Sequence, residues 1–147
     1  MHADGADHAA YVDEWLEGVD PALPPAVVAS LFEAALGALW RRTEVTLGEV
    51  TLAAIVDRVL FTAAEKHPFV ATITVGRAGP DFAAFREEAP RHTDIRAAMR
   101  VVLVEFLTVL GHLTDEIMTP ALHAELSNAV PAVQPVTPGR AAKRGSR

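Results

Sequence analysis

Apolar residues recur at three- and four-residue spacing along most of the chain, and this period is typical of amphipathic α-helices. The pattern predicts helices over residues 8–19, 25–42, 46–66, 81–89, 94–113 and 120–129. Proline marks several of the expected boundaries, because its ring is tolerated in a first helical turn and disfavours a helix before it. The first of these helices is expected to dock on the domain through Trp15.

The third predicted helix has the clearest local start signal. Thr46 and Glu49 have the spacing of a capping box, in which the Thr46 hydroxyl would cap the first turn. Val45 and Val50 stand where a hydrophobic staple would hold the entering chain. The long helix 94–113 has a comparable signal, with Thr93 as its expected cap.

Residues 69–75 change period, from the helical spacing to an alternation of apolar and β-branched residues. Period-two alternation predicts a short extended segment. No other segment of the sequence offers an obvious strand to pair with it. It is therefore expected either as extended coil packed on helices or as a strand that pairs with a second copy across a two-fold axis.

The segment 94–113 is the most informative, because it is apolar on nearly every side. A helix of this kind is normally buried by neighbours on several sides. Glu105 lies within it and must be paired, protonated or at the rim, since burying a lone charge is very costly. Arg41, Arg58 and Arg100 are its candidate partners, with a structural ion pair or an exposed position as the alternative to a functional acid.

These patterns predict an all-α fold. The expected architecture is an orthogonal or bundle-like array of about five to six helices around the central apolar helix 94–113, with one short extended segment near 69–75. The expected division is an acidic N-terminal segment with a docking helix at 1–20 and a helical domain at 21–130, followed by a disordered, proline-rich and basic tail at 131–147.

Composition narrows the classes of partner. The chain has 147 residues and a net charge of −6, which argues against nucleic acid as a main partner. Its longest strongly apolar stretch, 101–113, is too short to cross a bilayer, so no membrane is expected. The absence of cysteine excludes thiolate chemistry and is compatible with a reducing compartment, and the expected location is cytoplasmic.

Catalytic and cofactor motifs are absent from the sequence. It contains neither a Gly-x-Ser-x-Gly nucleophile motif nor a glycine-rich phosphate loop, and no His-x-x-x-His or Glu-x-x-His pair occurs on a predicted helix. No catalytic residue, metal site or cofactor is therefore predicted. The polar residues expected to contact a ligand or partner are Glu105, His112, Thr108 and His67.

The sequence favours a non-catalytic regulatory or signalling module that acts through protein–protein interaction as a homodimer. Self-association would cover both the apolar helix and the unpaired extended segment. The alternative is a small-ligand or haem-type sensor with a pocket between helices, in which His67 or His112 would be the axial ligand. A small helical enzyme with Glu105 as its acid or base is the third hypothesis.

Overall fold

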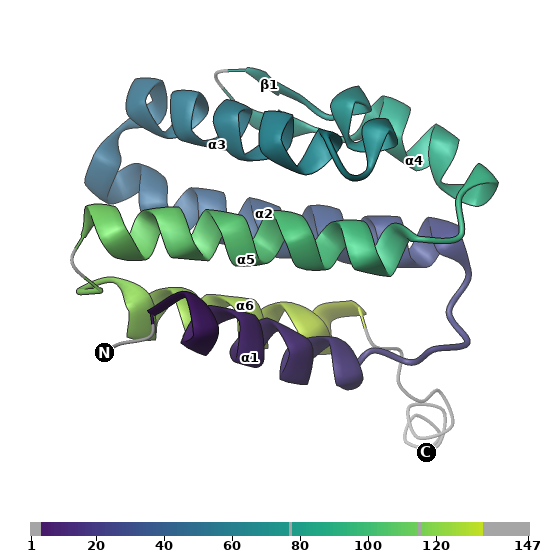
Figure 1. Ribbon diagram of the computed structural model, residues 1–147, viewed down its shortest axis with the longest axis horizontal. Helices are drawn as coiled ribbons and strands as arrows, with labels where there is room; N and C mark the ends of the chain where they lie inside the picture. The colour runs from purple at the N-terminus through teal and green to yellow at the C-terminus, as the bar shows by residue number, and fades with distance from the viewer. Residues whose placement is uncertain (1–3, 77, 115, 134–147) are drawn as a thin grey trace, which may run out of the picture.

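The computed structural model describes residues 4–76, 78–114 and 116–133 (Figure 1). Helices dominate these residues, and the only sheet among them is a two-stranded hairpin, which confirms the predicted all-α class. The elements in chain order are α1 (Asp4–Glu17), α2 (Pro25–Leu47), α3 (Glu49–Ala64), the 3-10 helix η1 (Pro68–Thr72), β1 (Thr74–Gly76), β2 (Gly79–Asp81), α4 (Ala83–Glu88), the 3-10 helix η2 (Ala89–Arg91), α5 (Ile95–Leu113) and α6 (Thr119–Val133).

The long helices run side by side in two layers. In Figure 1, α3, α5 and α1 form the front layer, with α5 in the middle, and α2 and α6 lie behind them. The β1–β2 hairpin and α4 close one side of the molecule against α2. Because α5 contacts α1, α2, α3 and α6, it occupies the centre of the arrangement.

The core follows the inward side of α5. Its buried side chains are Ile95, Ala98, Met99, Val102, Leu103, Phe106, Leu107 and Leu110. The side that carries Val101, Glu105 and Thr108 is only half-buried, because no described helix covers the front of α5. The predicted helix 94–113 thus forms with nearly the expected bounds, and it has one open side.

The predicted capping box at Thr46 is wrong. Helix α2 continues through Leu47 and ends at Gly48, whose φ of 86° is readily adopted only by glycine. Thr46 therefore lies in the last turn of α2, and α3 begins at Glu49 without a side-chain cap. Val45 and Val50 are 87% and 80% exposed, so they form no hydrophobic staple.

The predicted extended segment 69–75 is also wrong over most of its length. Residues 68–72 form η1, which buries Phe69 and Val70 in the core. The backbone is extended only from Ile73 onward, and β1 pairs with β2 of the same chain in an antiparallel hairpin. The hairpin needs Gly79, because its φ is 112° and a side chain there would meet the Trp40 indole.

Three smaller expectations concern the docking of Trp15, the start of α5 and the end of α6. Trp15 is buried against the core, as predicted for the docking helix. Asp94 rather than Thr93 precedes the first turn of α5, and no side chain caps that turn. Helix α6 extends to Val133, into the segment predicted as a tail, and the rest of that segment lies outside the described residues.

In the part of the chain that the structure describes, no helix combines the length and apolarity needed to cross a membrane.

Candidate functional site

A groove of about 780 Å³ runs between α3 and α5 on the front of the molecule. It is lined by Val50, Thr51, Ala54, Ile55, Arg58, Val59, Thr62, Glu105, Val109 and Leu113. The two helices run in opposite directions, so the start of α3 lies beside the end of α5 (Figure 1). We call this surface the α3/α5 groove.

Large apolar side chains are exposed in this groove and beside it. Val50 and Leu113 line it and are 80% and 58% exposed. Phe61, which is 65% exposed, does not line the groove, but it lies about three helical turns after Val50 and therefore on the same side of α3. Single exposed apolar residues are common, but a set gathered on one face marks an interaction surface.

One basic and one acidic side chain complete the groove wall. Arg58 projects from α3 and is exposed, whereas Glu105 projects from α5 and is half-buried. Among the described residues, neither side chain forms an ion pair within 4.0 Å. The sequence left Glu105 as paired, protonated or at the rim, and its half-buried place in the groove wall supports the rim.

The candidate arginine partners of Glu105 have other neighbours. The Arg100 guanidinium donates two hydrogen bonds to the Asp13 carboxylate on α1, with Nε 2.5 Å from Oδ1. These hydrogen bonds hold the pKa of Asp13 below its ordinary value, and they raise the pKa of Arg100. Arg41 lines a separate hollow beside Trp40 and Glu44.

The structure does not bring the four predicted site residues together. Glu105 lines the groove, but Thr108 and His112 do not, although both lie on α5. His67 lies beyond the opposite end of the groove, near the first turn of α5. Its Nδ1 is 2.9 Å from Oδ2 of Asp94, and this hydrogen bond holds the pKa of Asp94 below its ordinary value.

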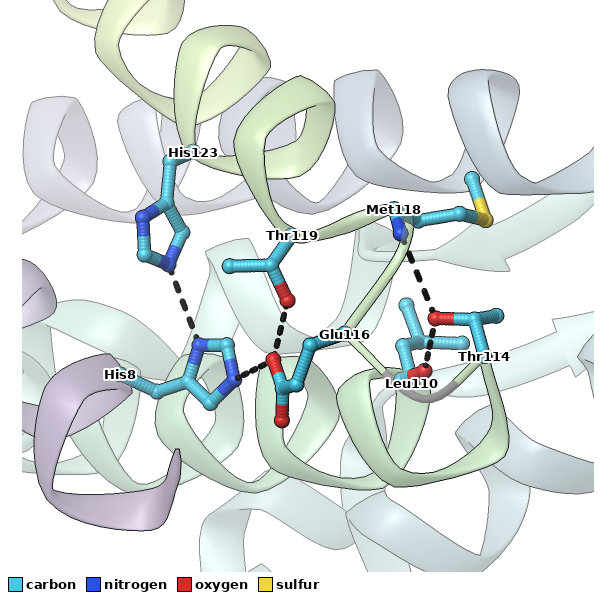
Figure 2. Close-up of polar contacts among 7 residues, drawn as sticks. All are labelled: His8, Leu110, Thr114, Glu116, Met118, Thr119 and His123. Carbon is cyan, nitrogen blue, oxygen red and sulfur yellow. Dashed lines mark hydrogen bonds and ion pairs between the residues drawn. The ribbon is translucent and has the colours of Figure 1, made fainter. Parts of the chain in front are cut away.

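A second site, missed by the sequence analysis, lies where α1 meets the start of α6. His8 of α1 is only 1% exposed and stands between His123 of α6 and Glu116, which precedes α6 (Figure 2). His8 Nδ1 is 3.1 Å from His123 Nε2. On its other side, His8 Nε2 is 3.3 Å from Glu116 Oε1, close enough for an ion pair but outside hydrogen-bond geometry. We call these three residues the histidine cluster.

Further contacts tie α1 to α6 around the cluster. The Tyr11 ring stacks on the His123 ring with centroids 4.0 Å apart, and its hydroxyl donates to the His123 carbonyl at 2.8 Å. The same hydroxyl contacts the Ser127 hydroxyl. A hollow of about 500 Å³ opens beside these groups, and Glu14 lines it together with the three residues of the cluster.

Glu116 occupies an unusual backbone position. Its φ of 62° lies in the left-handed region, which is uncommon for residues other than glycine and is often found at functional sites. Its amide donates to the Gly111 carbonyl at 2.6 Å, and its carboxylate lies over Gly111. A Cβ at Gly111 would come within 2.7 Å of Glu116 Oε2, so glycine leaves the space that the carboxylate fills.

No local signal in the sequence could have found the histidine cluster. His8 and His123 are separated by 115 positions and meet only because α1 and α6 pack together. In the sequence, Glu116 follows His112 by four positions, a spacing that would suit a continuous helix. The left-handed turn at Glu116 instead directs its carboxylate back towards His8.

Neither site forms a metal centre within the described residues, where no three His, Cys, Asp or Glu side chains gather in a metal-binding arrangement. Comparisons of the chain with protein families, curated proteins and solved structures find no match. The two sites are therefore interpreted from their own geometry.

Proposed function

We propose that the protein is a non-catalytic, homodimeric interaction module, and that the α3/α5 groove is the surface on which two copies meet. The observation that carries this proposal is the exposed apolar face formed by Val50, Phe61 and Leu113 beside an open groove. Burial of such side chains drives most protein–protein association, at roughly 25 cal/mol per Å² of apolar surface.

The charges in the groove favour a second copy as the occupant. The whole chain carries a net charge of −6, which opposes self-association over most of its surface. The groove itself has one arginine and one glutamate, on opposite walls. A two-fold axis running along the groove would place Arg58 of each copy across from Glu105 of the other, so the surface is complementary to itself.

This pairing is tested by reversing the charges separately. Arg58→Glu would face a glutamate across the axis, and Glu105→Arg would face an arginine, so each variant alone should dimerise at least about tenfold more weakly. A mixture of the two variants should form a heterodimer, because both contacts across the axis again join opposite charges. Sedimentation velocity on each variant and on the mixture measures these states.

The mixing experiment separates a contact between copies from one within a chain. If Arg58 and Glu105 acted only within one chain, mixing the two variants would restore nothing, and the proposal would be wrong. A doubly reversed chain cannot make this distinction, because it restores both kinds of contact. Arg91→Glu, at an exposed arginine far from the groove, is the matched control and should dimerise like the unaltered protein.

A small-ligand sensor is the second candidate, favoured by the size of the groove. A volume of about 780 Å³ with mostly apolar walls, two charged side chains and two threonines falls in the range of ligand pockets. A ligand bound there would compete with the second copy. Thermal-shift screening of apolar metabolites, together with measurement of the particle mass, tests this candidate. A ligand bound in the groove should raise Tm and yield monomer, whereas a compound that does not bind there should change neither.

A further inference from the structure

We propose that the buried pair of His8 and His123 is a proton-operated latch, which holds α1 against α6 with up to one added proton and releases it when a second proton binds. The inference does not depend on the groove or on dimerisation. It rests on the geometry of the histidine cluster, where three titratable side chains from separate segments meet around a fully enclosed imidazole (Figure 2).

The contact between the two rings fixes where protons can lie. Across the 3.1 Å between His8 Nδ1 and His123 Nε2, one nitrogen must carry a proton and the other must accept it. With both rings neutral, His123 donates to His8, and the remaining proton of His8 lies on Nε2, facing Glu116. Each of the three nitrogens in these contacts then faces a complementary atom.

One added proton preserves this arrangement. His8 becomes a cation with protons on both nitrogens, and it donates to His123 Nε2 while its other N–H faces the Glu116 carboxylate. The opposite charge of Glu116 lies 3.3 Å away and offsets part of the cost of burying the imidazolium. The latch therefore stays closed.

A second added proton cannot be accommodated. Both rings would then be cations, and two N–H groups would face each other across 3.1 Å with no acceptor between them. Little water can screen a charge on His8, which is 1% exposed, although His123 is half-buried and lines the hollow. Repulsion at this distance favours separation of the rings, and this separation removes the contact by which His8 holds α1 against α6.

Neither Glu14 nor Glu116 removes the conflict between the two facing N–H groups. Glu14 lines the hollow from α1 and is exposed, and protonation of Glu116 in stronger acid would only weaken its attraction for His8. From α5, Arg100 holds Asp13, and Arg96 binds the carbonyls of Val19 and Asp20. The Asp13 contact lies within α1 and the Arg96 contacts lie just beyond its end, so they would tether the released helix without replacing the latch.

Amide hydrogen exchange on the full chain tests the latch. Exchange of α1, corrected for the intrinsic effect of pH, is compared with that of α2 between about pH 7.5 and pH 5, the range in which histidine normally changes charge. The expected result is a fall of at least about tenfold in the protection of α1, while the protection of α2 is retained. Equal protection of α1 at both pH values would overturn the proposal.

Two substitutions at His123 make opposite predictions. His123→Gln retains an amide that can donate or accept but cannot become a cation, so the protection of α1 should no longer depend on pH. His123→Lys replaces one of the two added protons with a permanent charge, so a single proton on His8 should then release α1, and protection should fall at a higher pH than in the unaltered protein. A pH dependence in His123→Gln equal to that of the unaltered protein would contradict the latch.

The matched control is His112→Gln, at an exposed histidine on α5 outside the cluster. This variant loses one titratable imidazole but leaves the latch intact, so its α1 should respond to pH as in the unaltered protein. If His112→Gln also lost the response, the pH dependence would arise outside the cluster and the proposal would be wrong. Dimerisation through the α3/α5 groove should be unchanged in all three variants at about pH 7.5.

Discussion

At the scale of single residues, Gly111 is constrained by a neighbouring carboxylate. It is buried in the last turns of α5, where the Glu116 carboxylate occupies the space that a side chain would need. Glycine in a helix normally costs roughly 0.5–1 kcal/mol relative to alanine. Its presence at this position is therefore explained by the close approach of Glu116 and not by the helix itself.

Two glycine-to-alanine substitutions should have opposite effects. Gly111→Ala places a Cβ 2.7 Å from the Glu116 carboxylate, which must move out of its contacts with His8 and Thr119, so the substitution should destabilise the fold by up to about 1 kcal/mol. Gly37→Ala, within α2, meets only the flexible end of Arg41 at 3.4 Å and should stabilise by up to about 1 kcal/mol. Urea denaturation measures both values, and a loss at Gly37 as large as at Gly111 would contradict this explanation.

The ion pair between Asp13 and Arg100 makes a prediction about pH. The pKa of Asp13 is lowered in the folded protein, so its contribution to stability is present at neutral pH and is lost as pH falls below the unfolded value of about 3.9. Because both side chains are more than 40% exposed, Asp13→Asn should cost no more than about 1 kcal/mol.

Denaturation in urea at about pH 7 and pH 3 measures this difference. The variant and the unaltered protein should differ in free energy of unfolding at the higher pH and should converge at the lower one. A difference that grows in acid would show that Arg100 does not stabilise the ionised carboxyl.

At the scale of elements, α5 was the easiest to predict, because an apolar pattern with a helical period extends over its whole length. Helix ends were harder. The spacing of Thr46 and Glu49 predicted that a helix starts at Thr46. In the structure the boundary between α2 and α3 lies at Gly48, whose positive φ interrupts the helical backbone. A local motif was overridden by the continuation of α2.

The hairpin shows a second limit of sequence patterns. Alternation in 69–75 indicated one extended segment, but burial of Phe69 and Val70 in the core is achieved by a 3-10 turn. The true partner of β1 contains glycine and proline, which are depleted in strands and gave no strand signal. Its position depends on Gly79 packing against Trp40, a contact made only in the folded chain.

Substitution of two phenylalanines compares a buried side of the helices with an exposed side. Phe106→Ala, at a fully buried position on α5, should destabilise the fold by about 3–5 kcal/mol. Phe61→Ala, at a residue that is 65% exposed, should change the stability of the monomer by no more than about 0.5 kcal/mol.

The same pair also tests the proposed interface. Phe61→Ala should weaken dimerisation although it leaves the monomer stable, and thermal unfolding at low protein concentration together with sedimentation at high concentration measures the two effects. Strong destabilisation of the monomer by Phe61→Ala would mean that this side of α3 is buried within one chain.

At the scale of the whole molecule, the sequence predicted the helical class and the importance of one long apolar helix. It identified Glu105 because a charge in an apolar helix stands out, and the structure places this residue at the α3/α5 groove. It could not identify the histidine cluster, because the approach of His8 to His123 and Glu116 depends on the packing of α1 against α6.

The two surfaces share no lining residue. The α3/α5 groove, with its apolar side chains and its pair of opposite charges, is proposed to bind a second copy, whereas the histidine cluster is proposed to hold α1. A change in α1 would therefore alter the far side of α5 without touching the residues proposed to join two copies.

The mass of the particle in solution tests the central claim most directly. Multi-angle light scattering across a concentration series at neutral pH should give a value near twice the chain mass of 15.7 kDa, and this value should fall towards 15.7 kDa for Arg58→Glu alone. A mass of 15.7 kDa for the unaltered protein at every concentration would contradict the account.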